Sequence, residues 1–586
     1  MATPASARKE TVVSAPGKVL IAGGYLVLDP AYPGLVISTS SRFYTVVRTR
    51  DGEASGRFPV KVLSPQFVGA EWGFVVSIQG EEVTLVQTKE TYTSPHAGPN
   101  PFLSLSILYA LRLAKETRGT DALAASLSPG GLDIYVLADN DFYSQRSSSG
   151  AAPSTSELQS IPPFQSQGKP IKDVHKTGLG SSAAMTTSLV GSLLIHLGAV
   201  PTAPDGSLPS ESLALIHNTA QLAHCAAQGK VGSGFDVSAA VWGSHLFRRF
   251  DKDVIQGILD RGERVAVEGS PEAETSDSSE TLWPALQPSN PLWHPSPLSS
   301  GQVGETHPTA VEGLAASISD NLKVARPAPM ALPPRFEMVL ADVDAGSNTP
   351  SLVGKVTEWK RSKPEWAKQL YRILASANQT LADSLFSLTL AYGQDPEAYD
   401  EAVELAASKK SKEWDALVKE KPSSVLKLLI ETRNAMRSVQ GGMRELGRQA
   451  GAPVEPNEMG DVIKASIDGS EGIVGGGVPG AGGYDAMFLL YLRPPSVGNG
   501  SAPGRDKVEQ LWSEWTALSV GPLLCSAGGS ASASTAALEQ QAKMLSQVHG
   551  GQPSGAAPAV AAPTNDGGLR LVSVDEVKGL KDALER

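Results

Sequence analysis

The chain has 586 residues, so it exceeds one ordinary domain, and we expect two domains with insertions. Its hydrophobic content of 41% and charged content of 19% are typical of a soluble globular protein with a sizeable core. The net charge of -11 argues against nucleic acid as a main partner, because a phosphate backbone requires a basic surface. An anionic small molecule would need a local basic pocket.

The N-terminal domain, expected over residues 1–265, opens with β-type runs. Apolar segments flank the glycine turn Ala15-Pro16-Gly17-Lys18, and further strands are expected at 35–37, 43–47 and 72–78. A helical pattern then begins after Asn100-Pro101 and gives way to a strand at 132–136. The pattern predicts a mixed α and β domain.

A glycine- and serine-rich turn, Lys176 to Met185, leads directly into a long apolar segment. Gly178 and Gly180 allow a tight turn, and Ser181 or Ser182 can cap the following helix. Free amides and the positive end of the helix dipole favour phosphate at such a place. The alternative is an ordinary capped helix after a flexible loop.

Two segments on either side of this turn are predicted to lie outside the packed domains. Residues 147–170 are rich in serine, proline and glycine and predict a flexible excursion. A helix over 210–228 should end at Gly229 and deliver the loop Lys230 to Asp236. Residues 266–333 are dense in Ser, Pro, Glu and Thr, so we expect a disordered linker that can be shortened.

The C-terminal domain, expected over 334–525, carries most of the remaining helices. A strand is expected at 336–343, and a buried strand at 486–492. The predicted helices are 365–390, 396–409, 411–420 and 423–447. Just before the strand at 486–492, the stretch Gly475 to Gly483 has too many glycines for a helix or strand interior and predicts a turn. Residues 526–586 are predicted to form a flexible tail.

Three glycine-rich turns therefore carry the chemistry, because one holds Lys18 and another stands beside Asp236. A phosphate cradle, a cation and a carboxylate are what phosphoryl transfer needs, since this reaction depends on positioning and charge compensation. Neither the Walker spacing nor a dinucleotide-binding fingerprint is present. The sequence predicts another kind of phosphate cradle.

These motifs resemble, in order and rough spacing, those of the GHMP kinases of sugars and isoprenoid precursors. The three shared motifs are Ala15 to Lys18, Gly178 to Ala184 and Gly475 to Gly483. Four further segments resemble the eukaryotic phosphomevalonate kinases: Ala22 to Leu28, Asp139 to Ser144, Gly229 to Asp236 and Gly346 to Ser351.

The resemblance implies an α+β fold of two domains, a ribosomal-S5-like N-terminal domain and a ferredoxin-like C-terminal domain, with the site between them. It implies ATP- and Mg²⁺-dependent phosphorylation of 5-phosphomevalonate, giving 5-diphosphomevalonate and ADP. The expected partners are thus ATP and 5-phosphomevalonate, without nucleic acid or membrane. Sister GHMP kinases such as mevalonate kinase, and an inactive ligand sensor on the same fold, remain alternatives.

The resemblance also assigns site residues. Lys18 and Asp236 would be catalytic, and Ser182 would help to bind Mg²⁺. The residues expected to bind ATP are Asn100, Lys176, Gly178, Leu179, Gly180, Ser181, Ser182 and Ala183. The residues expected to bind the acceptor are Lys18, Tyr25, Ser144, Arg146, Lys230, Ser233, Ser347, Thr349, Gly480, Ala481 and Gly482.

Single residues in this set also have simpler interpretations. Lys18 can be a solvated turn lysine, and Asp236 can be a turn or cap residue, a general base or an orienting charge. Many relatives place a glutamate ligand for Mg²⁺ upstream of the aspartate, but residues 213–235 contain no acidic side chain. His217 and His224, seven residues apart on one helix, are expected to pack or to support the site indirectly.

The compartment is expected to be the cytoplasm. Cys225 and Cys525 offer neither a disulfide framework nor a zinc spacing, which favours a reducing environment. The first ten residues lack the apolar run of a signal peptide, and no apolar stretch is long enough to span a bilayer. The C-terminus carries no lipidation or peroxisomal tripeptide. The sequence leaves open whether the protein is a monomer or a homodimer.

Overall fold

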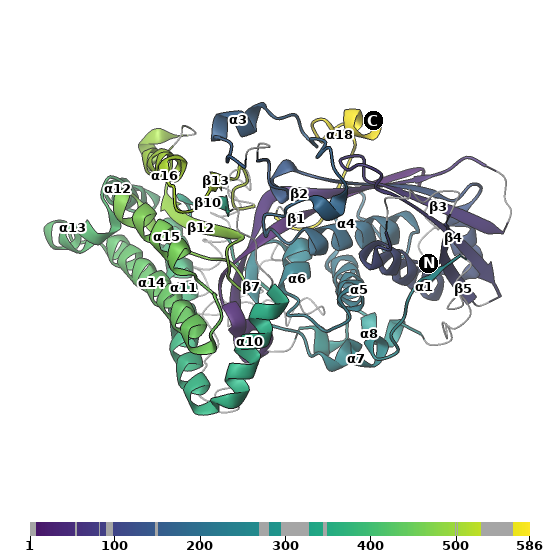
Figure 1. Ribbon diagram of the computed structural model, residues 1–586, viewed down its shortest axis with the longest axis horizontal. Helices are drawn as coiled ribbons and strands as arrows, with labels where there is room; N and C mark the ends of the chain where they lie inside the picture. Colours follow the sequence, from purple (N-terminus) through teal and green to yellow (C-terminus); the bar gives the residue numbers. More distant parts are fainter. Residues whose placement is uncertain are drawn as a thin grey trace, which may run out of the picture.

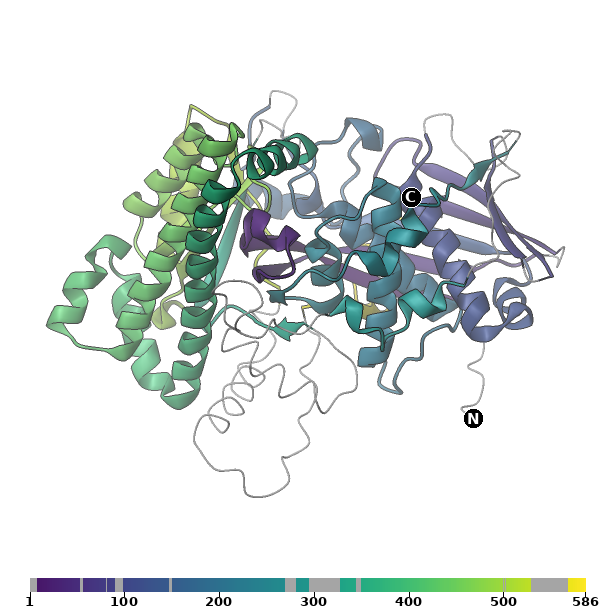
Figure 2. The same ribbon diagram turned by 90° about the horizontal axis from the view of Figure 1, so that it is seen from below.

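The structure, a computed structural model, has two domains that lie side by side, each built on its own sheet (Figure 1). It describes residues 8–52, 56–80, 82–89, 98–146, 150–268, 281–294, 327–343, 349–498, 500, 502–528 and 567–586. Figure 2 shows the hairpin between the first two strands pressed against the helices of the second domain. None of the helices in these ranges combines the length and apolar character needed to cross a membrane.

The N-terminal domain is organised on a sheet whose described strands follow the order β14-β1-β2-β6-β3-β4-β5-β8, with β7 paired to β2 and β9 to β7. β1 and β2 are long because both are rich in β-branched residues and are buried along most of their length. The strands are β1 (Glu10–Ala22), β2 (Gly34–Thr49), β3 (Arg57–Leu63), β4 (Glu71–Gln79), β5 (Glu82–Gln87), β6 (Leu132–Ala138), β7 (His245–Phe247), β8 (Ala266–Val267), β9 (Ala328–Pro329) and β14 (Arg570–Val572).

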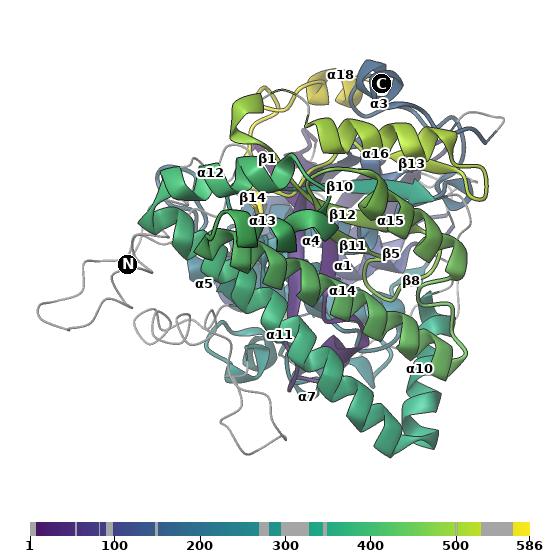
Figure 3. The same cartoon turned by 90° about the vertical axis from the view of Figure 1, so that its left-hand side faces the viewer.

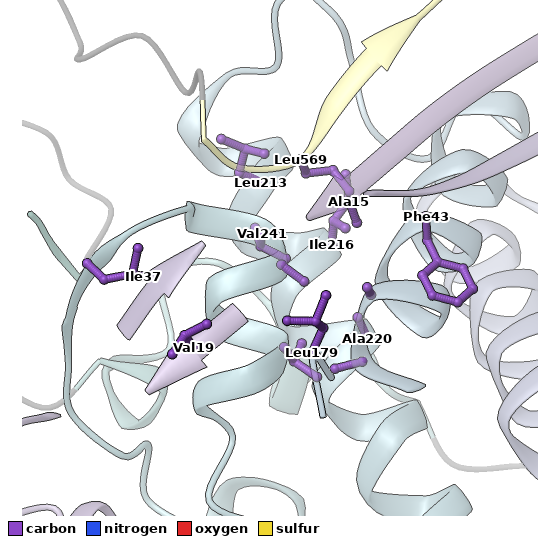
Figure 4. Close-up of a cluster of buried hydrophobic side chains, with 14 of the residues drawn as sticks. Ala15, Val19, Ile37, Phe43, Leu179, Leu213, Ile216, Ala220, Val241 and Leu569 are labelled. Carbon is purple, nitrogen blue, oxygen red and sulfur yellow. The ribbon is translucent and has the colours of Figure 1, made fainter. Parts of the chain in front are cut away.

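Helices α4 and α6 pack against β1, and α1 and α5 pack around α4 (Figure 1). Helix α5 has the predicted bounds and ends at Gly229, whose φ of 66° is left-handed and confirms the expected cap. The helices are α1 (Pro101–Arg118), α2 (Thr120–Leu127), α3 (Thr155–Ser160), α4 (Ser181–His196), α5 (Ser210–Gln228), α6 (Phe235–Trp242), α7 (Asp253–Leu259), α8 (Trp283–Leu286) and α18 (Leu580–Leu584). Figure 4 shows part of this core, where Val19 of β1 lies beside Ile37 of β2, and Leu179 lies beside Ala220.

The C-terminal domain has an antiparallel sheet with the order β11-β12-β10-β13. Because helices separate β10 from β11 and β12 from β13, this is the ferredoxin-like arrangement, and the predicted α+β class is confirmed. Figure 3 shows the long helices stacked in front of the sheet. The elements are β10 (Phe336–Val343), α10 (Thr349–Ser362), α11 (Pro364–Gln394), α12 (Pro396–Ala407), α13 (Trp414–Glu420), α14 (Ser424–Ala450), α15 (Asn457–Gly469), β11 (Ile473–Gly477), β12 (Ala486–Leu492), α16 (Pro503–Glu514) and β13 (Val520–Pro522).

The segment around Lys18 was predicted to form a turn, but it is part of β1. A shift of register between Pro16 and Lys18 marks a β-bulge, which accommodates a proline that has no N–H to give to the ladder. At Gly17, a Cβ would stand 2.7 Å from Thr39 Oγ1 and 3.1 Å from the carbonyl oxygen of Leu179. The glycine therefore allows the bulge to approach the phosphate turn.

The third glycine motif also differs from the prediction, because its first three glycines lie in β11. A Cβ on Gly475 would lie 3.0 Å from Met436 Cβ, and one on Gly476 would lie 2.4 Å from Leu489 Cδ2. Glycine is needed here because α14 and β12 approach the strand too closely for a side chain. Only residues 478–485 form the connection to β12.

The predicted excursion and tail are also partly packed. Phe164, within 147–170, is buried and lies edge-on to Tyr44 with ring centroids 5.5 Å apart. In the expected tail, β14 pairs with β1 in antiparallel fashion, and Leu569 is buried in the core (Figure 4). The end of the chain thus returns from the second domain to the first, a long-range pairing that composition does not reveal.

The predicted linker 266–333 contains a packed element as well. β8 pairs with β5, and β9 pairs with β7. Trp293 is 1% exposed and lies 5.1 Å from the ring centroid of Phe250 and 5.7 Å from that of His217. Its Nε1 donates to the carbonyl of Ala285 at 2.8 Å. Residues 281–294 therefore belong to the N-terminal domain, and the remainder of the predicted linker between 269 and 326 lies outside the described residues.

Replacing Trp293 by alanine is expected to lower the free energy of unfolding by about 3–5 kcal/mol, because a large buried aromatic would leave a cavity. Trp283 in the same segment is 40% exposed and is the matched control. Its alanine variant should lose far less, as exposed positions usually do. Denaturant unfolding of both variants measures the difference, and equal stabilities would mean that this segment is not part of the core.

Candidate active site

The phosphate turn is held open at the start of α4. Gly178 and Gly180 have φ values of 77° and 79°, so both need the left-handed region that glycine allows. Gly180 is the residue before the helix, and no side chain caps it, so neither Ser181 nor Ser182 plays the predicted capping role. An uncapped helix N-terminus presents free amides and a positive dipole end, which suit a phosphate group.

The segment Asp139 to Ser144 holds the residues just before this turn by hydrogen bonds and a β-bridge. Thr177 N donates to the carbonyl of Phe142 at 3.3 Å, and Thr177 Oγ1 donates to the carbonyl of Asp141. Tyr143 and Lys176 form an isolated β-bridge. Sequence resemblance alone had connected this segment with ligand binding, and the contacts give it a scaffolding role.

Lys18 reaches the phosphate turn from the bulge in β1. Its Nζ donates to the carbonyl of Gly178 at 2.8 Å, and its backbone N–H donates to the carbonyl of Leu179 at 3.0 Å. Burial lowers the pKa of Lys18 below its usual value, and the carboxylates of Asp236 and Asp485 oppose this shift. Lys18 is thus a half-buried cation between the turn and two carboxylates.

Asp236 stands in the first turn of α6, which follows the left-handed Gly234 with φ of 87°. Its Oδ1 accepts from the N–H of Val237 at 3.0 Å, and its Oδ2 lies 3.9 Å from His224 Nε2. His224 Nε2 is also 3.1 Å from Ser182 Oγ. Burial lowers the pKa of His224, and Asp236 opposes this shift. The starts of α4 and α6 therefore meet at one place.

Asp485 was not predicted as a site residue, although it directly follows the third glycine motif. A Cβ on Gly178 would lie 3.9 Å from Asp485 Cβ and 3.7 Å from Ala486 Cβ, so the start of β12 borders the phosphate turn. The signal was an acidic residue at the junction of a glycine turn and a buried strand. Asp485 was missed because the phosphate turn that it borders belongs to the other domain.

The turn after β11 closes the site from the C-terminal domain. Tyr25 donates its hydroxyl proton to the carbonyl of Ala481 at 2.7 Å, and Gly480 N donates to the carbonyl of Leu20 at 3.4 Å. A Cβ on Gly482 would lie 1.9 Å from the carbonyl oxygen of Val454, so only glycine fits there. The three predicted turn residues 480–482 and Tyr25 thus meet at the domain boundary.

A small cavity adjoins this boundary and is lined by Gly24, Gln440, Glu455 and Gly477 among others. Its volume of about 30 Å³ has room for roughly two water molecules, which is too little for a phosphorylated substrate. Burial raises the pKa of Glu455 to about 7, although Gln440 donates to it and Arg444 lies nearby.

Two predicted acceptor residues are engaged with the second domain. Ser144 Oγ donates to Asp342 Oδ2 at 2.6 Å, and Arg146 Nε donates to the same oxygen at 3.2 Å. Arg146 also donates to the carbonyl of Ser519 at 3.0 Å. These contacts make both residues a tie between the domains.

The remaining predicted site residues that the structure describes lie at a helix cap, in the loop after α5, or at the start of α10. Asn100 caps α1 by accepting from Leu103 N at 3.4 Å. Lys230 is exposed in the loop after α5, and Ser233 is half-buried there. That loop is held by Arg249, a residue not predicted, which donates to the carbonyls of Val231 and Gly232. Ser347 lies outside the described residues, and Thr349 begins α10, where only its backbone is described.

Replacing Gly180 by alanine is expected to lower turnover by about a hundredfold, because misplacing catalytic groups by about 1 Å costs that much. The added Cβ would lie 2.9 Å from Lys18 Cε at a backbone φ of 79°. Gly451 is the matched control, because it is also left-handed but has no atom within 4 Å of a Cβ. Steady-state kinetics and thermal unfolding compare the two.

Both glycine variants should lose about 1–2 kcal/mol of stability from left-handed backbone strain. Only the one at position 180 should lose turnover. If both keep wild-type turnover, the contact between the turn and Lys18 does not matter for activity.

A glycine turn at an open helix end, a lysine and a carboxylate lie at the boundary of two domains, the arrangement that the resemblance to the GHMP kinases implies. No family model matches the chain. It is 33% identical over 533 residues to "Phosphomevalonate kinase, peroxisomal" of Arabidopsis thaliana, covering 87% of this chain and 93% of the relative. The chain belongs to the phosphomevalonate kinase family.

A second relative agrees with this assignment, and one solved structure shares the fold. The chain is 33% identical over 513 residues to "Phosphomevalonate kinase erg8" of Aspergillus fumigatus, covering 83% of this chain and 88% of the relative. Among solved structures, a Lin0012 protein from Listeria innocua superimposes with a TM-score of 0.50 at 14% identity, covering 88% of this chain and 96% of that one. The latter likeness concerns the fold alone.

Proposed function

We propose that the protein transfers the γ-phosphate of ATP to (R)-5-phosphomevalonate, giving (R)-5-diphosphomevalonate and ADP in the mevalonate pathway of isoprenoid and sterol biosynthesis. The observation that carries the chemistry is the place of Lys18, 2.8 Å from the carbonyl of Gly178 and electrostatically coupled to Asp236. Membership of the phosphomevalonate kinase family supports the choice of acceptor.

In this reaction the bond between the γ-phosphorus and the bridging oxygen of ATP breaks, and an oxygen of the acceptor phosphate forms the new bond. The open N-terminus of α4 would hold the ATP phosphates through its amides. Lys18 would neutralise charge between the two mutually repelling phosphates. Asp236 would fix Lys18 and orient the acceptor.

We further propose that Ser182 is a protein ligand of Mg²⁺. Magnesium prefers oxygen ligands, keeps several waters and is bound through few protein groups plus substrate phosphates. Ser182 Oγ and Asp236 Oδ2 supply oxygens that lie 3.1 Å and 3.9 Å from the same nitrogen, His224 Nε2. The described residues hold no group of three or more His, Cys, Asp or Glu suited to a metal, which fits an ion that arrives with ATP. When bound, Mg²⁺ would neutralise phosphate charge.

The acceptor would lie on the side of Lys18 bounded by Tyr25, the loop 230–234 and the turn 480–482. The hydrogen bond from Tyr25 to Ala481 fixes two walls of that space relative to each other. We also propose a reducing compartment such as the cytosol, because Cys225 and Cys525 are both free and buried. Imaging of the tagged chain tests this, since one relative is named as peroxisomal.

Coupled measurement of ADP release tests the proposed reaction with three mixtures: 5-phosphomevalonate, mevalonate and no acceptor. We expect rapid release with 5-phosphomevalonate only. Release with mevalonate alone would instead identify a sister kinase. Nucleotide binding without release in any mixture would identify a ligand sensor.

A further inference from the structure

His224 lies where the starts of two helices meet, at the end of α5. Its Nε2 is 3.1 Å from Ser182 Oγ at the start of α4 and 3.9 Å from Asp236 Oδ2 at the start of α6. The ring is buried and lies against Phe102, with centroids 5.5 Å apart. A single imidazole nitrogen thus faces both oxygen-bearing side chains.

The position of this histidine is specific to the site. His217, one heptad earlier on the same helix, bonds through Nδ1 to Asn218 Oδ1 at 2.9 Å and packs against Trp293. It therefore belongs to the core packing two turns earlier along the same face of α5. Residues 213–235 contain no acidic side chain that could do the work of His224.

Orientation is what such a contact supplies. A serine hydroxyl rotates freely unless a partner fixes it, and a fixed hydroxyl keeps a lone pair in a defined direction. The carboxylate of Asp236 is already held on one oxygen by Val237 N, so its Oδ2 is the oxygen that faces the ring. The buried ring itself is held by its packing against Phe102.

We propose that His224 is a positioning residue, whose Nε2 fixes the Ser182 hydroxyl by a hydrogen bond and lies beside the Asp236 carboxylate in the arrangement that phosphoryl transfer requires. This inference rests on the proposed function. His224 acts through Ser182 and Asp236 and does not touch the reacting atoms. Groups that orient ligands in this way typically change metal affinity or activity by about 10–100-fold when replaced.

The test compares His224→Leu, which removes the hydrogen bond, with His224→Gln, whose amide can replace the Nε2 contact. His217→Gln is the control on the same helix. Calorimetry measures binding of the non-hydrolysable ATP analogue AMPPNP with Mg²⁺ and with EDTA, and steady-state kinetics and thermal unfolding accompany it.

In His224→Leu, we expect the gain in AMPPNP affinity that Mg²⁺ provides to fall by about tenfold or more. The kcat should fall by about the same factor. AMPPNP binding in EDTA should stay unchanged. His224→Gln should recover most of the Mg²⁺ gain and of kcat. His217→Gln should lower only the unfolding temperature.

A wild-type Mg²⁺ gain and kcat in His224→Leu would overturn the proposal. So would a loss in His224→Gln as large as in His224→Leu, because that would show only a packing role. If wild-type protein does not phosphorylate 5-phosphomevalonate, the proposed function fails, but the AMPPNP measurements still decide the role of His224.

Discussion

Lys18→Met is expected to lower kcat by about a hundred- to a thousandfold while ATP affinity stays nearly unchanged, because removing one donor to a developing charge typically costs that much. The lysine reaches the carbonyl of Gly178 at 2.8 Å and is coupled to Asp236 and Asp485. Under the proposed function, its charge would therefore lie where the two phosphates approach each other. Methionine keeps the length of the side chain and removes the charge.

Steady-state kinetics and nucleotide titration measure the two effects separately. Lys252→Met is the control, because Lys252 is exposed and its ion pair among the described residues is with its neighbour Asp253. The control should behave like the wild-type protein. Unchanged turnover in Lys18→Met would return Lys18 to the role of an ordinary structural lysine.

Asp236→Asn is expected to be at least about a hundredfold slower and to bind ATP nearly normally. The acceptor phosphate has a second pKa of about 6, by analogy with other monoesters, and so is largely deprotonated near neutral pH. A general base is then less necessary, and under the proposed function the carboxylate would act by fixing Lys18. The acidic limb of kcat should therefore persist in the variant, because it follows the acceptor.

The basic limb gives a sign that can be checked. Burial lowers the pKa of Lys18, and Asp236 and Asp485 raise it. Without the carboxylate at 236, the pKa of Lys18 falls further, so kcat should begin to fall at lower pH than in the wild-type protein. Asp485→Asn should shift the basic limb in the same direction by less, since its effect on Lys18 is the smaller of the two.

Loss of the acidic limb in Asp236→Asn would identify Asp236 as the general base. Wild-type turnover would remove it from the site. A basic limb that does not move in either variant would contradict the coupling between the carboxylates and Lys18.

Local signals predicted much of this fold and site. The apolar stripe Leu213, Ile216, Ala220 and Ala223 and the capping Gly229 predicted α5 at its observed bounds, because both signals act over a few residues. The glycine turn before α4 was found for the same reason, since Gly178 and Gly180 need the left-handed conformation that their residue type suggests.

Contacts between distant segments were not predictable in this way. Gly475 to Gly477 form a strand because they pair with β12, and glycine is needed at 475 because Met436 of α14, distant in the sequence, comes close. Trp293 is buried although the stretch 266–333 is dense in Ser, Pro, Glu and Thr, because it packs against Phe250 and His217. Composition describes neighbours along the chain and gives no information about such partners.

Asp485 and His224 show the same limit at the site. Asp485 approaches Lys18 only because the two domains meet at the phosphate turn. His224 and His217 are both histidines on one face of α5, yet His224 contacts Ser182 whereas His217 contacts Asn218. Sequence spacing identifies the face of a helix but not the segment that packs against it.

The product of the reaction tests the central claim most directly. Phosphorus NMR of the protein with ATP, Mg²⁺ and 5-phosphomevalonate should show ADP together with a new pair of coupled diphosphate resonances, as the acceptor monoester resonance declines. A diphosphate pair means that the new bond joins two phosphates. A mixture that yields only inorganic phosphate, or in which the acceptor monoester persists while mevalonate is phosphorylated instead, would contradict the account.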